Sequence, residues 1–405
     1  MRSLPARLLS VRPGGLRTIL PAAVALALCT AGALAQEVQR TGCVPPGIWA
    51  DGTGAAVEPV PLLRRIADSP VVLLGEQHDR PDHHRWQLHT LAGLHALNPD
   101  VAVGLEMLPR RLQPVLDRWV AGDLTEEEFL QQTDWRTVWG FDPQFYLPIL
   151  QFARLHRLPV VALNVERSLI SRTARNGWSA VPEAEREGVG TPAAPSADYR
   201  ARLREALAAH DRSESQADPA SSAGDPSTRF IEAQTVWDRA MAEKIAETRR
   251  VTGRLVVGIL GEGHAAHRDG IPHQLADLGV ADSVVLLPWD ADRDCGELDG
   301  RIADAVFGLG VEPRENAPPP PKLGVQLGPA PDGVAVSTVS DGSVAAAAGI
   351  RAGDRILNAA GSSLRAPADL VAIIRRQAPG TWLPLTIRRD GAEQELVAKF
   401  PVQAR

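Results

Sequence analysis

The chain has 405 residues, of which 44% are apolar, and its 43 basic residues are outnumbered by 49 acidic ones. This length is enough for two or three globular domains. The formal net charge is −6, so the chain has no excess of basic residues and we expect no nucleic-acid partner.

Residues 1–35 have the pattern of a secretory signal peptide. Four arginines precede an apolar run from Ile19 to Leu28, and Ala33-Leu-Ala35 is a small-x-small cleavage site. The run is too short to span a bilayer comfortably. We predict cleavage after Ala35 and an exported protein, either periplasmic or associated with the outer membrane. Cys29 would allow a lipid anchor, although Leu28 before it fits a lipoprotein signal poorly.

Removal of this segment leaves two cysteines, Cys43 and Cys295. Two cysteines of an exported chain are commonly joined, because the compartment is oxidising. We therefore predict a Cys43–Cys295 disulfide.

Residues 36–316 alternate between short apolar runs and longer amphipathic segments, which predicts an α/β domain with a parallel sheet flanked by helices. The predicted strands are Val71–Leu74, Val101–Leu105, Pro159–Leu163, Leu255–Leu260 and Val284–Leu287. The clearest predicted helices begin at Pro81, Arg110, Asp142 and Phe230.

Polar residues follow four of these strands directly. They are Glu76 and His78, Glu106, Asn164 and Glu166, and Glu262 and His264. Two of the four sets share the pattern Gly-Glu-x-His. Because the carboxyl ends of parallel strands meet at one edge of a sheet, these side chains predict a shared pocket.

Other candidates lie on the predicted helices. His83 and His84 fall in the first turns after Pro81, Tyr146 lies close to the aromatic residues around Trp139, and Trp237 shares a helix face with Met241. A purely structural role is the alternative for each of these residues. Tyrosine, tryptophan and methionine at helical spacing are usually core residues, and paired histidines often line a solvated helix.

A proline-rich linker, residues 317–322, precedes a second domain at residues 323–402. Short strands separated by glycine-containing turns, with a helix from Ala366 to Gln377, predict a small α+β domain.

The segments LLGEQHDRPDHHRWQ, GLEMLPRRLQPVLDRW, FDPQFYLPILQFAR, VVALNVERSL, IEAQTVWDRAMA and GILGEGHAAHRDGIPHQL resemble the ChaN-type haem-binding lipoprotein family, in the family's order over residues 71–287. The resemblance implies an α/β fold, an extracytoplasmic location, and haem bound at the interface of a homodimer through a tyrosine. Glu262 departs from the family, where a non-acidic residue is commoner, as does the poor lipoprotein signal.

The tail, KLGVQL … SVAAAAGIRAGDRIL … TIRRDG, is similar to a circularly permuted bacterial PDZ domain. That similarity implies a groove beside the helix near residue 370, in which a peptide or a protein C-terminus binds as an added strand. The residues implied to bind it are Leu323, Gly324, Val325, Gln326 and Leu327.

Three classes of function remain open. A haem carrier would use Tyr146 as the iron ligand, with His78, His83, His84, His264, Trp237 and Met241 as further haem-binding candidates. A hydrolase would use Glu76, His78, Glu106, Glu262 and His264, either with a divalent metal such as Mn, Co or Zn or as acid and base. Erythromycin esterases and Tiki-type metalloproteases, which have a similar fold, place Glu and His at such strand ends. A scaffold protein would use the PDZ-like domain alone.

Overall fold

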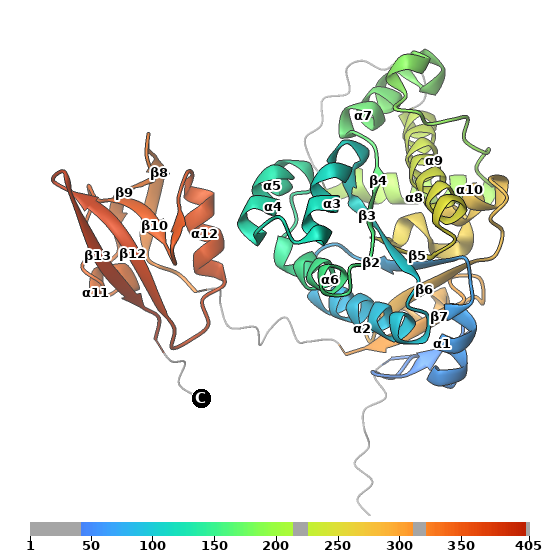
Figure 1. Cartoon of the computed structure of the whole chain (residues 1–405), viewed down its shortest axis with the longest axis horizontal. Helices are drawn as coiled ribbons and strands as arrows, with labels where there is room; N and C mark the ends of the chain where they lie inside the picture. Colours follow the sequence, from blue (N-terminus) through green and yellow to red (C-terminus); the bar gives the residue numbers. More distant parts are fainter. Residues whose placement is uncertain (1–41, 214–225, 311–320, 402–405) are drawn as a thin grey trace, which may run out of the picture. The chain divides into compact units, whose positions relative to one another are not determined.

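The computed structural model describes residues 42–213, 226–310 and 321–401. They form two compact units, one ending at Gly310 and one beginning after it (Figure 1). The predicted signal peptide, its cleavage site, Cys29 and most of the predicted linker lie outside the described residues.

The first unit is built on a seven-stranded sheet. Its strands are β1 (Trp49–Ala50), β2 (Val71–Glu76), β3 (Val101–Pro109), β4 (Val160–Asn164), β5 (Leu255–Gly261), β6 (Ser283–Asp290) and β7 (Ala305–Leu309). The order across the sheet is β1-β7-β6-β2-β5-β3-β4, and every neighbouring pair is parallel except β1 with β7. The predicted parallel α/β sheet is confirmed. β1 and β7 were not predicted.

Helices cover both faces of this sheet (Figure 1). They are α1 (Pro59–Ala67), α2 (Pro81–Leu97), α3 (Gln113–Ala121), α4 (Glu126–Gln132), α5 (Trp135–Val138), α6 (Pro143–Leu155), α7 (Arg167–Asn176), α8 (Ala197–Ser213), α9 (Pro226–Thr252) and α10 (Ile271–Asp277). Side chains alternate between the two faces of a strand, so β2 contributes to two separate cores. Val72 and Leu74 pack with residues of α1–α6, whereas Val71 and Leu73 pack with residues of α9 and α10.

Local sequence signals fix the ends of the helices nearest the site. Pro81 and Pro143 occupy first-turn positions, where the missing N–H costs nothing. The Asp142 carboxylate accepts a hydrogen bond from the backbone N–H of Gln144 at 2.9 Å and so caps α6. These starts place Tyr146 and the paired histidines in the first turns of their helices.

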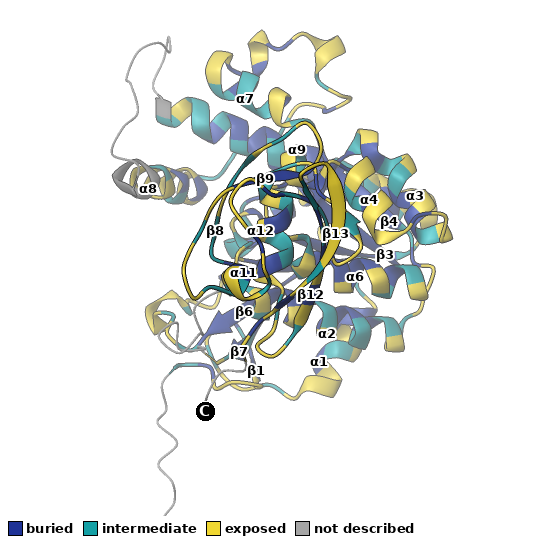
Figure 2. Cartoon of the chain, turned by 90° about the vertical axis from the view of Figure 1, so that its left-hand side faces the viewer, coloured by how far each residue is buried: buried dark blue, intermediate teal, exposed yellow. Residues whose placement is uncertain are grey.

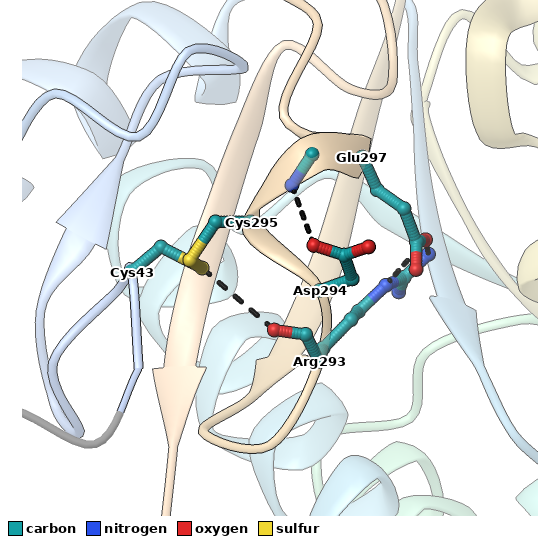
Figure 3. Close-up of a disulfide and its surroundings, with 6 residues drawn as sticks. Cys43, Arg293, Asp294, Cys295 and Glu297 are labelled. Atoms are coloured by element: carbon teal, nitrogen blue, oxygen red, sulfur yellow. Dashed lines mark hydrogen bonds and ion pairs between the residues drawn. A yellow bond between two sulfur atoms is a disulfide. The ribbon is translucent and has the colours of Figure 1, made fainter.

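A disulfide joins Cys43, near the start of the described chain, to Cys295 in the short 3₁₀ helix η6 (Cys295–Glu297) that follows β6 (Figure 3). The Asp294 carboxylate accepts the N–H of Gly296 at 2.9 Å and caps this helix. The predicted pairing is confirmed, and the bridge closes a loop with a sequence separation of 252.

The second unit contains β8 (Val325–Pro329), β9 (Val334–Val339), α11 (Val344–Ala347), β10 (Arg355–Ala359), β11 (Ser362–Ser363), α12 (Pro367–Arg375), β12 (Trp382–Arg389) and β13 (Ala392–Lys399). Its antiparallel sheet has the order β13-β12-β10-β9-β8, with β11 beside β10. Leu323, Ile356 and Leu370 belong to its own apolar core. Figure 2 shows that β13, by contrast, is largely exposed. The predicted small α+β domain is confirmed.

Among the described helices of both units, none has the length and apolar character needed to cross a membrane.

Candidate functional site

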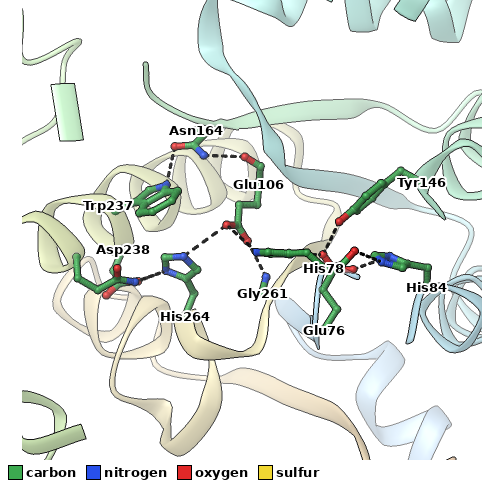
Figure 4. A network of polar contacts seen from close by, with 11 residues as sticks. Glu76, His78, His84, Glu106, Tyr146, Asn164, Trp237, Asp238, Gly261 and His264 are labelled. Atoms are coloured by element: carbon green, nitrogen blue, oxygen red, sulfur yellow. Dashed lines mark hydrogen bonds and ion pairs between the residues drawn. The ribbon is translucent and has the colours of Figure 1, made fainter. Parts of the chain in front are cut away.

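The polar residues predicted at the strand ends lie at one edge of the sheet. β2, β5, β3 and β4 are consecutive neighbours, so Glu76, His264, Glu106 and Asn164 come from adjacent strands or from the turn that follows one. Figure 4 shows these side chains converging. The strand order explains why residues almost 190 positions apart share one site.

Glu76 is the centre of the first half of this site. It is 1% exposed, and its carboxylate accepts hydrogen bonds from His78 Nδ1 at 2.7 Å and from the Tyr146 hydroxyl at 2.9 Å. His84 Nδ1 forms an ion pair with its second oxygen at 2.5 Å. Burial alone would raise the pKa of Glu76, but the contacts with His78 and His84 outweigh burial and lower it. Glu76 is therefore an ionised anchor for three aromatic side chains.

The second half repeats this arrangement with different residues. His264 follows β5 in the 3₁₀ helix η4 (Glu262–His264), and its Nδ1 donates to Asp238 of α9 at 2.6 Å. The Tyr199 hydroxyl donates to the other oxygen of Asp238 at 2.7 Å. Each histidine is thus held at Nδ1 by a carboxylate that also accepts a buried tyrosine hydroxyl.

Glu106 joins the two halves. Its Oε1 lies 4.0 Å from His78 Nε2 and 3.5 Å from His264 Nε2, and its Oε2 accepts the backbone N–H of Gly261 at 2.6 Å. A side chain at position 261 would displace His78, because a Cβ there would lie 2.9 Å from Cε1 of His78. The result is a continuous, largely buried network, which runs in the order Tyr146, Glu76, His78, Glu106, His264, Asp238 and Tyr199. Figure 4 shows it from Tyr146 to Asp238.

The network contains alternating charges. Burial would lower the pKa of His264, but the charges of Glu106 and Asp238 raise it to about 10. His78 also has a raised pKa, because its bond to Glu76 and the charge of Glu106 outweigh burial. Burial and the neighbouring carboxylates raise the pKa of both tyrosines well above the ordinary value of 10. Both phenols therefore stay protonated at neutral pH.

This charge pattern predicts a pH-dependent stability. A histidine whose pKa rises on folding contributes stability that is complete below its unfolded pKa of about 6.5 and is lost as the pH rises towards the folded value. We expect the free energy of unfolding to fall by a few kcal/mol between pH 7 and about pH 10, since the pKa of His264 rises to about 10. Urea unfolding at several pH values measures this fall. His264→Gln should flatten most of it; an equally steep fall in that variant would contradict the assignment.

A cavity of about 600 Å³ lies beside the network, at the ends of β3 and β4. Trp139 and Trp237 line it, and each packs against a histidine of the network: Trp139 against His78 and Trp237 against His264, with ring centroids 4.7 and 5.1 Å apart. The Trp237 Nε1–H donates to Asn164 Oδ1 at 2.7 Å, which fixes the ring. Apolar lining also comes from Met107, Val138, Val165 and Ile170.

Charged residues line the same cavity. Arg111 forms an ion pair with Glu166, and Arg167 and Asp134 are also part of the lining. An aromatic pocket with arginines suits a ligand that combines a flat apolar body with acidic groups.

The structure brings most of the predicted site residues together, but not all. Glu76, His78, His84, Glu106, Tyr146 and His264 belong to the network, and Trp237 lines the cavity. His83 instead contacts Asp290 at 3.2 Å, and Glu262 pairs with Arg293 at 2.9 Å. Met241 is fully buried in the core between α9 and the sheet.

Sequence analysis missed Asp238 and Tyr199. A signal for Asp238 exists, because it stands three positions before Met241 and so falls on the buried face of a long amphipathic helix. A charged residue at such a position needs a partner inside the protein. Tyr199 carries no comparable signal.

Within residues 42–213, 226–310 and 321–401, no group of three or more His, Cys, Asp and Glu side chains is arranged to hold a metal ion. Glu106 and the two imidazoles contact one another instead.

The chain belongs to the haem-binding uptake family of the Tiki superfamily, ChaN, whose profile matches residues 62–275, more than half of the chain. A PDZ-domain profile matches residues 321–399. The resemblances read from the sequence are confirmed.

Several solved structures are similar to parts of this chain. Campylobacter jejuni ChaN, described as binding haem cofacially, shares 19% identity and covers 64% of this chain and 95% of its own, with a TM-score of 0.49. The PDZ domain of HtrA3 shares 22% identity over 19% of this chain and 82% of its own, with a TM-score of 0.18. The Yersinia pestis serine endoprotease shares 26% identity over 20% of this chain and 29% of its own, with a TM-score of 0.18. No curated protein matches the chain.

Proposed function

We propose that this chain is an exported haem-binding protein, for uptake, carriage or storage of haem, that also captures a peptide through its PDZ domain. Membership of a haem-binding family supports the first part. The observation that carries it further is the cavity of about 600 Å³ walled by Trp139 and Trp237, with Arg111 and Arg167 in its lining. Tryptophan faces suit the apolar ring of haem, and arginines suit its two carboxylates.

The residues beside this cavity fit an iron-containing ring. His78 has a side chain that is 28% exposed, and its Nδ1 is held by Glu76. A carboxylate on one ring nitrogen is the usual arrangement of a histidine that binds metal through the other. When bound, haem would supply redox chemistry. His78 would hold the iron.

The sequence-based assignment of the iron ligand to Tyr146 stays a prediction. Tyr146 is 1% exposed and donates its hydrogen bond to Glu76, so the bond must break before its oxygen can reach iron. Its raised pKa also disfavours the tyrosinate form. We favour His78 because its side chain is 28% exposed, whereas that of Tyr146 is buried; His78 also has a raised pKa and must lose a proton before it binds iron.

A comparison of three variants separates these ligands. The mature protein is titrated with ferric haem. In His78→Ala we expect the affinity for haem to fall at least tenfold and the histidine-type spectrum to disappear. Tyr199→Phe should change neither, because Tyr199 contacts Asp238 on the far side of the network. Tyr146→Phe should also keep the spectrum. A tyrosinate-type spectrum that disappears only in Tyr146→Phe would return the ligand to Tyr146.

The PDZ domain offers an edge for peptide capture. In the described part of the chain β8 pairs with β9 alone, which leaves its other edge open there, and α12 contacts β8. We propose that a peptide or protein C-terminus adds to this edge as a further strand, with Leu323, Gly324, Val325, Gln326 and Leu327 along it. A homodimer with haem at the interface, and association with the outer membrane, remain proposals from family membership.

A second candidate function rests on the network itself. Two imidazoles face one buried carboxylate, and each is oriented by a further carboxylate, beside a cavity large enough for a substrate. Such groups suit acid–base hydrolysis of an ester or amide without requiring metal. His78→Ala and His264→Ala should then both abolish turnover of ester substrates; wild-type protein without esterase activity would remove this candidate.

A further inference from the structure

We infer that the outer surface between α2 and α6 is a second haem-binding site, with His89 as its iron ligand. This inference rests on the proposed function and adds a site distinct from the strand-end cavity. None of its residues belongs to the network.

The site is an open groove of about 520 Å³ between two helices that lie side by side (Figure 1). The lining on α2 is Arg85, Leu88, His89 and Ala92, and the lining on α6 is Pro148, Gln151, Phe152 and Leu155. Both sets follow the spacing i, i+3, i+4 and i+7, so each forms a single stripe on its helix.

The groove is largely apolar although it faces solvent. Leu155 is 77% exposed, and Leu88 and Phe152 are only partly buried. Exposed apolar side chains that gather in one groove usually mark a binding surface. A flat apolar ring would cover Leu88, Phe152 and Leu155 together and remove them from water.

His89 gives this surface its specificity for a metal-containing ring. Its side chain is exposed, and it has no hydrogen-bond or ion-pair partner among the residues that the structure describes. The other histidines of α2 differ, since His83 contacts Asp290, His84 contacts Glu76 and His95 packs on His156. A neutral imidazole with a free nitrogen above an apolar wall is a good ligand for haem iron.

Arg85 supplies the complementary charge. It lies one turn before His89 on α2, its side chain is 73% exposed, and its bond to Asp82 occupies only one nitrogen. A guanidinium group has five donors, so further donors remain for a carboxylate at the edge of the ring. The groove therefore combines apolar side chains, the imidazole of His89 and the guanidinium group of Arg85.

Haem stoichiometry tests the inference. Mature full-length protein is titrated with ferric haem, and bound haem per chain is measured after gel filtration by absorption, together with the ligand type from the ferric spectrum. Iron-free protoporphyrin is titrated in parallel. We expect two haems per wild-type chain and one in His89→Ala, with protoporphyrin binding in the groove weakened less than tenfold by the same change.

Matched variants separate iron ligation from folding and packing. His273→Ala removes a partly exposed histidine from α10, outside the groove, and should leave two haems bound. Leu155→Gln changes a side chain with few contacts to lose, so the protein should fold normally while the groove binds both haem and protoporphyrin more weakly.

Each outcome decides between the two sites. One haem per wild-type chain that survives His89→Ala and is lost in His78→Ala would overturn the inference and leave the proposed function intact. One haem lost in His89→Ala and unchanged in His78→Ala would support the groove and reject the cavity as the haem site. No saturable haem binding would overturn both.

Discussion

Glu106→Ala is expected to lower the free energy of unfolding of the first domain by about 3–5 kcal/mol. The change leaves the raised-pKa imidazoles of His78 and His264 without the carboxylate between them, and it leaves the backbone N–H of Gly261 without its acceptor. A buried charge that loses its partner costs more than the pair contributed, because the remaining group stays out of water. Urea unfolding followed by tryptophan fluorescence measures the difference.

Glu262→Gln is the matched control for Glu106→Ala. Glu262 is the acid of the second Gly-Glu-x-His motif, but it pairs with Arg293 at a partly exposed position. Its replacement should cost about 1 kcal/mol or less. If Glu106→Ala costs no more than this control, Glu106 does not join the two halves of the network in the way described above.

Removal of the disulfide is expected to have an effect of similar size. Cys43 and Cys295 are separated by 252 positions, and chain-entropy reasoning gives roughly 5–6 kcal/mol for closing so long a loop. We expect Cys43→Ser, Cys295→Ser and the double variant to lose this stability alike, since any one change opens the loop. Calorimetry is the suitable measurement, because it separates the transition of the first domain from that of the PDZ domain.

Chemical reduction provides the control for the disulfide. Wild-type protein treated with a reductant should match the double variant, and the reductant should not affect the variant itself. A double variant within about 1 kcal/mol of the oxidised wild type would show that the loop is already restrained by other contacts.

The sheet and the meeting of the strand ends could be predicted from the sequence, because both follow from local patterns. Apolar runs such as Val71–Leu74 are typical of strands buried on both faces, and helices between them require parallel pairing. Parallel pairing alone places Glu76, Glu106 and His264 at one edge. The strand β1 could not be predicted in the same way, since two residues carry too little pattern. β7 is as long as β4, and its apolar run was a usable signal that the sequence analysis missed.

The different roles of the two Gly-Glu-x-His motifs could not be predicted. Glu76 is the last residue of β2 and faces the interior, whereas Glu262 begins a 3₁₀ turn after β5 and faces Arg293. The place that Glu76 has beside His78 is taken beside His264 by Asp238, which comes from α9. The two identical motifs therefore have different roles, because the backbone after Gly75 differs from the backbone after Gly261.

The groove between α2 and α6 could not be predicted from sequence patterns either. His89 on an amphipathic helix is typical of a solvated position, and nothing in α2 alone indicates that Phe152 and Leu155 lie across from it. The order of helices on a sheet face depends on long-range packing. A single sequence reveals the stripe on each helix but not which two stripes meet.

A titration of the mature, oxidised full-length protein with ferric haem tests most directly whether this chain binds haem. We predict saturable binding at micromolar haem, with a Soret band distinct from that of free haem and haem that remains with the protein through gel filtration. Absorbance that rises linearly with added haem, and haem that separates from the protein on the column, would contradict the claim.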